Sequence, residues 1–120
     1  ARIAKTMAFV VAGHAVLVVI AGDGKVDNPR FKAAFHTKAA MVRPDQLVEQ
    51  VGHPMGGVCP FAIRDDVPVY LDESLKRFDV VYPAAGTASS AVRLTVPELE
   101  RSVQNFAGWV DIAKGWRAEG

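Results

Sequence analysis

Cysteine is almost absent from this chain, and so is any surplus of charge of one sign. The 120 residues include a single cysteine, Cys59, so no disulfide can form within the chain. Fourteen Lys and Arg residues stand against 13 Asp and Glu residues, which leaves a formal net charge of +1. This balance excludes a general basic coat for nucleic acid, and any such contact must come from a local site.

Long hydrophobic runs are also missing. The longest apolar stretch, residues 15–21, is too short to span a bilayer, and no signal-peptide pattern is visible. A lone thiol suits a reducing compartment. We therefore expect a cytoplasmic protein with no membrane partner.

The patterns that would hold a metal or activate a nucleophile are not found. The three histidines, His14, His36 and His53, have no i, i+4 partner, and no Cys/His pair has zinc spacing. Cys59 lies between apolar Val58 and Pro60, which favours a buried, inert thiol over a nucleophile. We expect neither a metal nor a cofactor.

What the chain does contain is a mixture of short strands and short helices, which fits one domain spanning residues 1–120. Strands are expected at residues 4–11, 16–20, 39–42, 67–71, 78–82 and 91–94. Helices are expected at residues 28–35, 44–51 and 95–103, with a docking helix or tail at 106–116. Pro68 suggests an edge or a bulge in its strand. The fold class is α/β (α+β), with a mixed, barrel-like β-sheet core and flanking short helices.

Several helix starts carry capping signals. Asn28 is the expected N-cap of its helix, with Pro29 at the first helical position. Asp72 is expected to cap the short turn at residues 73–75. Thr95 and Glu98 have the spacing of a capping box.

Two features are candidates for a working surface. Gly56 and Gly57, in the loop GGVCP, allow backbone N–H groups to approach a ligand or to cradle an anion, although an ordinary turn explains them equally well. Lys5 begins a strand among apolar neighbours. It is either an edge gatekeeper or an inward cation that binds a phosphate or carboxylate or polarises a carbonyl.

Four segments in order, KT at residues 5–6, GGVCP at 56–60, YLDES at 70–74 and VYPAAG at 81–86, carry a resemblance. Together they resemble the YbaK/prolyl-tRNA-synthetase-associated domain family, the aminoacyl-tRNA-editing deacylases, from Arg2 to about Val103. The resemblance implies a barrel-like mixed sheet of six or seven strands. It also implies hydrolysis of the ester that joins a wrong amino acid to a tRNA 3′ end, often that of a proline tRNA.

The resemblance also implies roles for individual residues. Lys5 is the expected catalytic residue, which positions and polarises rather than attacks, since the family is described without a conventional nucleophile. The expected substrate-binding residues are Gly56, Gly57, Val58, Cys59, Pro60, Thr87, Ser89 and Ser90. Cysteine-specific members tend to carry a charge where residues 89–92 stand, so a small substrate such as alanine, serine or threonine is as compatible. The family's N-terminal helical segment is not found before Ala1.

The expected partner is the 3′ end of an aminoacyl-tRNA, with a tRNA synthetase as a further candidate. An alternative is a non-catalytic module of the same fold that binds tRNA ends, or a partner protein through Trp109 and Trp116. An apolar stripe of Phe106, Trp109, Val110 and Ile112 suggests packing on the domain itself, with an oligomer interface as the second interpretation. The sequence does not indicate an oligomeric state.

Overall fold

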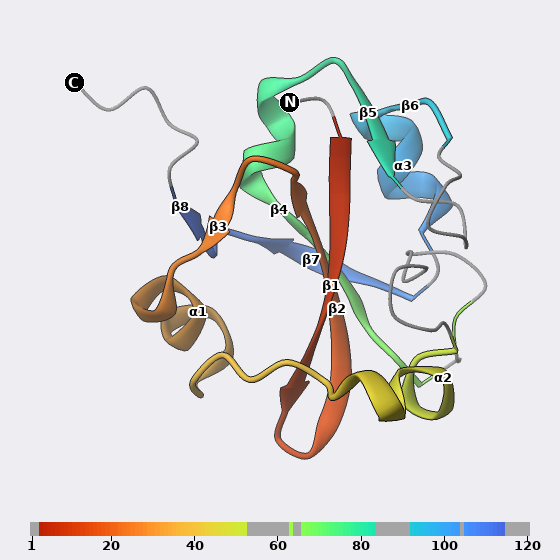
Figure 1. Cartoon of the computed structure of the whole chain (residues 1–120). Coiled ribbons are helices and arrows are strands. Elements are labelled where there is room, and N and C mark those ends of the chain that lie inside the picture. The colour runs from red at the N-terminus through yellow and green to blue at the C-terminus, as the bar shows by residue number, and fades with distance from the viewer. Residues whose placement is uncertain (1–2, 53–62, 64–65, 84–91, 104, 115–120) are drawn as a thin grey trace.

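A long antiparallel hairpin is the centre of the protein (Figure 1). In the computed structural model, which describes residues 3–52, 63, 66–83, 92–103 and 105–114, β1 (Ile3–Val11) pairs with β2 (His14–Ala21). Ala12 and Gly13 form the turn, both with positive φ. β2 is buried from Ala15 onward, because other elements cover both of its faces.

Four further strands extend this hairpin into a mixed six-stranded sheet of order β6-β5-β1-β2-β4-β7. They are β4 (Val69–Asp72), β5 (Val80–Pro83), β6 (Leu94–Thr95) and β7 (Phe106–Val110). The pairs β1/β5, β2/β4 and β4/β7 are parallel, whereas β5/β6 is antiparallel. A separate two-stranded ribbon joins β3 (Lys25–Val26) to β8 (Ala113–Lys114). The predicted mixed, barrel-like sheet with flanking short helices is confirmed.

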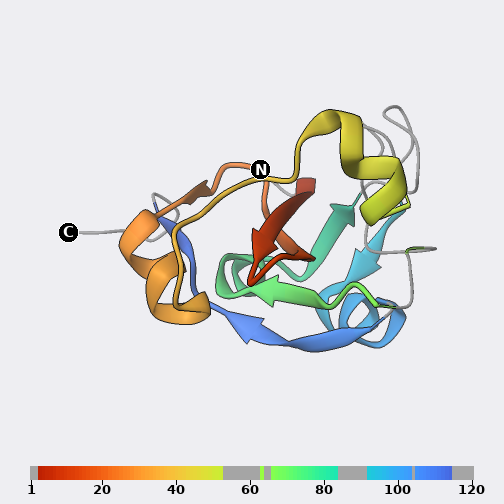
Figure 2. The same ribbon diagram turned by 90° about the horizontal axis from the view of Figure 1, so that it is seen from below.

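Helices cover the two faces of the curled sheet (Figures 1 and 2). On one face, α1 (Asn28–Phe35) inserts Phe31, whose ring centroid lies 4.8 Å from that of Phe9. On the other face, Leu47 of α2 (Leu47–Gln50) and Leu99 of α3 (Val96–Ser102) enter the larger core cluster. The short 3₁₀ helices η1 (Pro44–Gln46) and η2 (Glu73–Arg77) precede α2 and follow β4.

Four local expectations are corrected. The N-cap of α1 is Asp27, not Asn28, because the Asp27 carboxylate accepts the Arg30 backbone N–H at 3.1 Å. The strand expected at residues 39–42 is reduced to an isolated bridge between Phe9 and Met41. The helix expected at 44–51 is divided between η1 and α2, and the strand at 91–94 is reduced to Leu94–Thr95, with residue 91 outside the described part.

Two corrections concern the second half of the chain. Pro68 does not mark a sheet edge, because β4 lies between β2 and β7, but the predicted irregularity exists as a register shift between Val69 and Tyr70. The segment expected to be a docking helix or tail instead forms β7 and β8, while residues 115–120 lie outside the described part.

Candidate functional site

Lys5 lies on β1, a central strand of the sheet. It is the third residue of β1, is half-buried and has Ile20 of β2 as its register partner. Because side chains alternate along a strand, Lys5 shares the sheet face of Met7 and Phe9, opposite Ala4 and Ala8. β1 has β2 on one side and β5 on the other, but β5 pairs only with Ile3 and Ala4, so Lys5 lies one position beyond the end of that pairing.

The sheet brings a second predicted segment to Lys5. β5 runs parallel to β1, and its last residue, Pro83, pairs with Ala4. The backbone N–H of Val92 donates to the Pro83 carbonyl at 3.1 Å. Both described flanks of residues 84–91 are therefore anchored one position from Lys5. The predicted Thr87, Ser89 and Ser90 themselves lie outside the described residues.

The predicted glycine loop cannot be placed in the same way. Gly56, Gly57, Val58, Cys59 and Pro60 all fall in residues 53–62, outside the described part of the chain. The described residues on either side of that range are both anchored at the larger core cluster, which contains Leu47 and Ile63. Before it, the Gly52 N–H donates to the Leu47 carbonyl at 3.1 Å, and after it, Ile63 is buried in the same cluster as Leu47.

Three residues near Lys5, namely Ile3, Tyr82 and Gly22, were not assigned a role from the sequence. Ile3, 62% exposed, pairs with half-buried Tyr82 across the β1/β5 contact, on the same face as Lys5. Gly22 donates its N–H to the Ile3 carbonyl at 2.6 Å, and a Cβ on Gly22 would lie only 2.9 Å from that oxygen. The signal that could have drawn attention to Tyr82 is its place in the VYPAAG segment. Its contact with Ile3 depends on strand order, which no local pattern reveals.

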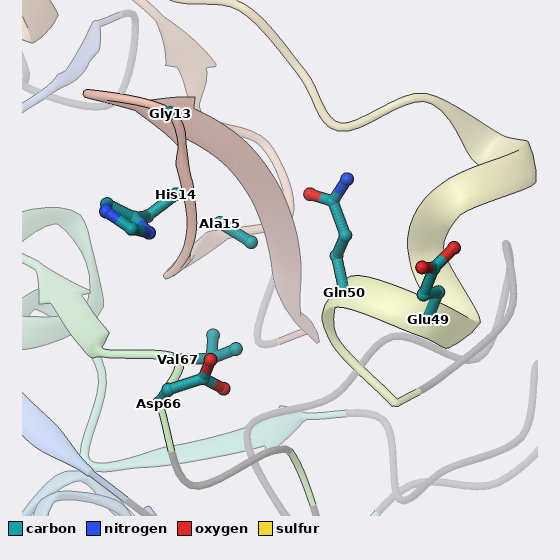
Figure 3. Close-up of a pocket in the computed structure, with 7 residues that line it drawn as sticks. All are labelled: Gly13, His14, Ala15, Glu49, Gln50, Asp66 and Val67. Carbon is teal, nitrogen blue, oxygen red and sulfur yellow. The ribbon is translucent and has the colours of Figure 1, made fainter.

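A cavity lies at the other end of the hairpin (Figure 3). It has a volume of about 270 Å³ and is lined by Gly13, His14, Ala15, Glu49, Gln50, Asp66 and Val67. His14 pairs with Val11 at the end of β1, six residues beyond Lys5. At a rise of about 3.3 Å per residue, the cavity is roughly 20 Å from Lys5. Figure 3 shows His14 and Glu49 on opposite sides of the hairpin end, so these two groups form no acid–base pair.

Neither a metal centre nor a membrane span is found among the described residues. No group of three or more His, Cys, Asp or Glu side chains in that part of the chain is placed to hold a metal ion. None of the helices described is both long and apolar enough to cross a membrane.

Comparison with known proteins identifies the family of this chain. A model of the aminoacyl-tRNA editing domain matches residues 1–102. The chain belongs to this family, which confirms the resemblance predicted from the four segments.

Individual relatives support the same assignment. The chain is 47% identical over 117 residues to YwhH, an uncharacterized protein of Bacillus subtilis (strain 168), covering 96% of this chain and 73% of YwhH. It is 28% identical over 91 residues to EbsC of Enterococcus faecalis, a proposed Cys-tRNA(Pro)/Cys-tRNA(Cys) deacylase, covering 75% of this chain and 55% of EbsC. The crystal structure of a proposed trans-editing enzyme for prolyl-tRNA synthetase superposes with a TM-score of 0.81 at 28% identity, covering 95% of this chain and 71% of that one.

Proposed function

We propose that this protein hydrolyses, in trans, the ester bond between a wrongly attached small amino acid and the 3′ end of a tRNA, with proline tRNA as the first candidate. The observation that carries the proposal is a half-buried lysine on the central strand β1 of an aminoacyl-tRNA editing domain, one position from the end of β5. The names of EbsC and of the superposed crystal structure support a deacylase that acts on tRNAs of this kind.

The reaction requires little acid–base power. Water adds to the ester carbonyl carbon, the bond from that carbon to the ribose oxygen breaks, and the ribose oxygen takes up a proton. The products are a free amino acid and a tRNA with a restored hydroxyl. An aminoacyl ester is already activated, so positioning and stabilisation of the developing negative charge can suffice. Lys5 would supply both, through a contact with the carbonyl oxygen or the terminal phosphate.

Selectivity would come from the size of the aminoacyl pocket. A tight site rejects the larger, correct amino acid, while a smaller wrong one enters and is hydrolysed. Thr87, Ser89 and Ser90 would give a small, hydroxyl-lined wall suited to alanine, serine or threonine. The N–H groups of Gly56 and Gly57 would hold the aminoacyl group.

The direct test offers the folded protein a panel of tRNAs charged with alanine, cysteine, serine or threonine, proline tRNA among them. Release of the amino acid from at least one of them is expected. A folded protein that releases none of the four contradicts the proposal.

The role of Lys5 is tested by Lys5→Ala. Removal of one preorganised charge-stabilising donor lowers kcat by about 10²- to 10³-fold in comparable sites. Lys76→Ala, which removes an exposed cation on η2, is the matched control and should retain activity. Far-UV circular dichroism and urea unfolding check that both variants fold. Normal deacylation by Lys5→Ala would show that the lysine has no part in the reaction.

The alternative of a non-catalytic module that binds partners through its tryptophans has less support. The Trp109 indole N–H donates to Glu100 at 2.6 Å, and Lys76 Nζ lies 4.4 Å from the ring centroid. Trp109 is therefore engaged within its own domain, while Trp116 lies outside the described residues. Tight binding of a charged 3′-end analogue without turnover would favour this alternative over the deacylase.

A further inference from the structure

Two lysines stand directly opposite one another on the β3–β8 ribbon. Lys25 and Lys114 are register partners in an antiparallel pair, so their side chains emerge next to each other on one face, and both are exposed. Like charges placed directly opposite in a sheet are destabilising. An anion bound between the two lysines would relieve this repulsion.

Internal ion pairs neutralise this region only in part. Lys114 Nζ is 3.9 Å from the Asp27 carboxylate, and Arg30 is held by Asp111 at 3.0 Å. Within the described residues, Lys25 takes part in no ion pair, nor do Lys32 and Lys38. Lys32 and Lys38 are exposed as well. We call Lys25, Lys32, Lys38 and Lys114 the basic flank.

The charge of the whole chain is unevenly distributed around the basic flank. Residues 25–38 hold four cations and one carboxylate, a net charge of +3, whereas the whole chain has +1. The rest of the chain therefore carries −2. Although composition excludes a general basic coat, the structure gathers positive charge on β3, β8, α1 and the residues just after α1; the three elements lie on one side of the molecule in Figures 1 and 2.

The basic flank begins close to Lys5. The N–H of Gly22 donates to the carbonyl of Ile3, two residues before Lys5, and the turn at residues 22–24 leads directly into β3. Three residues span at most about 10 Å, so Lys25 cannot lie far from this end of β1. A chain of phosphates that starts at Lys5 can therefore continue onto the ribbon.

We propose that the basic flank binds the sugar–phosphate backbone of the tRNA whose 3′ end reaches Lys5. This inference rests on the proposed function and adds the surface that holds the body of the substrate. Polyanionic RNA fits better than a membrane surface, because a membrane-binding face combines its cations with exposed large apolar side chains. None of the exposed large hydrophobic residues of the described part lies on β3, β8 or α1; Ile3 and Met41 lie next to the flank as single residues, Ile3 at its contact with Gly22 and Met41 three positions after Lys38.

The experiment measures the binding of uncharged tRNA to the full chain by fluorescence anisotropy between 50 and 200 mM salt. For the double variant Lys25→Ala/Lys114→Ala, we expect affinity to fall by on the order of tenfold and the salt dependence of log K to become shallower by about 1.5 to 2. The matched control, Arg43→Ala/Arg101→Ala, removes two exposed cations, one just before η1 and one on α3, and should leave both quantities unchanged.

A second measurement compares kcat/KM on a mischarged tRNA with kcat/KM on a 3′-aminoacyl-adenosine. The double variant should lose about tenfold more on the tRNA, because only the tRNA reaches the basic flank. Unchanged affinity and salt slope, or an equal loss in the arginine control, would overturn the inference, and the lysines would then serve as edge protection. Since uncharged tRNA needs no turnover, lysine-dependent binding without deacylation would instead count against the proposed activity.

Discussion

Asp72 shows how one residue can join distant parts of this fold. The side chain is fully buried at the end of β4. One carboxylate oxygen accepts the Ser74 N–H at 2.9 Å, and the other accepts the Ile112 N–H at 2.7 Å. The carboxylate thus begins η2 and fixes the chain between β7 and β8. The first of these bonds is predictable from the sequence as a cap, but the second connects residues 40 positions apart.

Asp72→Ala should therefore be among the more destabilising polar substitutions in the chain. It leaves two buried N–H groups unpaired, and the free energy of unfolding should fall by about 3 kcal/mol. Asp72→Asn keeps the shape of the side chain and one acceptor oxygen. We therefore expect its free energy of unfolding to lie between those of the wild type and the alanine variant. Urea unfolding followed by circular dichroism gives both values. A loss below about 1 kcal/mol in Asp72→Ala would mean that water replaces the carboxylate at no cost.

Lys5 shows what a residue pattern can predict and what it cannot. Its position at the start of a strand is evident from the apolar run around it, and the structure confirms that strand as β1. Whether the strand is at an edge is not evident, because this depends on β5, which lies more than 70 residues further along the chain. The neighbours of Lys5 in the sheet therefore follow from the strand order and not from the local pattern.

At the scale of elements, α3 follows from local sequence. Thr95 Oγ1 accepts the Glu98 N–H at 3.2 Å, and the Glu98 carboxylate accepts the Thr95 N–H at 2.9 Å, as a capping box requires. The helix in turn buries Leu99 in the larger core cluster. Such a short helix depends on its cap and on packing, because its few backbone hydrogen bonds do not offset the cost of nucleation.

Thr95→Ala should lower the free energy of unfolding by about 1 kcal/mol, because the N–H of Glu98 loses its acceptor. Thr95→Ser keeps the hydroxyl oxygen and should stay close to wild type. Urea unfolding of the wild type, Thr95→Ala and Thr95→Ser measures these differences in the free energy of unfolding. Equal losses for serine and alanine would assign the effect to the methyl group of Thr95 rather than to its hydroxyl.

β7 is the element that local reasoning assigned wrongly. Phe106, Trp109 and Val110 have the spacing of a helical stripe, yet the segment is a strand paired with β4. The structure places Trp109 against the larger core cluster and Val110 against the smaller one, as the alternation of a strand requires. Gly108, with a φ of 141°, carried a usable signal, because glycine is unfavourable inside a helix.

At the scale of the whole molecule, the order of the motifs along the chain is visible in the sequence. Which of them lie close together in the fold is not. The sequence of Lys5, the glycine loop and the VYPAAG segment predicts the family. The parallel contact between β1 and β5 that anchors the flanks of residues 84–91 beside Lys5 is a long-range pairing. The basic flank could not be predicted from the sequence for the same reason, because Lys25 and Lys114 are adjacent only through the β3–β8 pairing.

A further long-range contact should make the stability of the whole molecule depend on pH. Arg77 on η2 donates to both carboxylate oxygens of Asp23, at 2.5 and 3.2 Å, and so holds the turn that leads to β3. The hydrogen bond from Arg77 lowers the pKa of Asp23 below its usual value of 3.8. Because the folded-state pKa is the lower one, the ion pair stabilises the fold above the unfolded-state pKa. That stabilisation is lost as the pH falls through 3.8 toward the folded-state pKa.

Asp23→Asn should accordingly cost stability at neutral pH and almost none in acid. The Asp23 side chain is 42% exposed, so solvent weakens the pair, and we expect a difference from wild type of about 0.5 to 1 kcal/mol near pH 7. Urea unfolding at several pH values should show this difference shrinking toward zero near pH 3. Asp45→Asn is the matched control, since its pair with Arg43 spans only two residues and ties no distant segments together. If the stability difference between Asp23→Asn and the wild type is the same at pH 7 and pH 3, the contact acts through shape alone and not through the charge of the carboxylate.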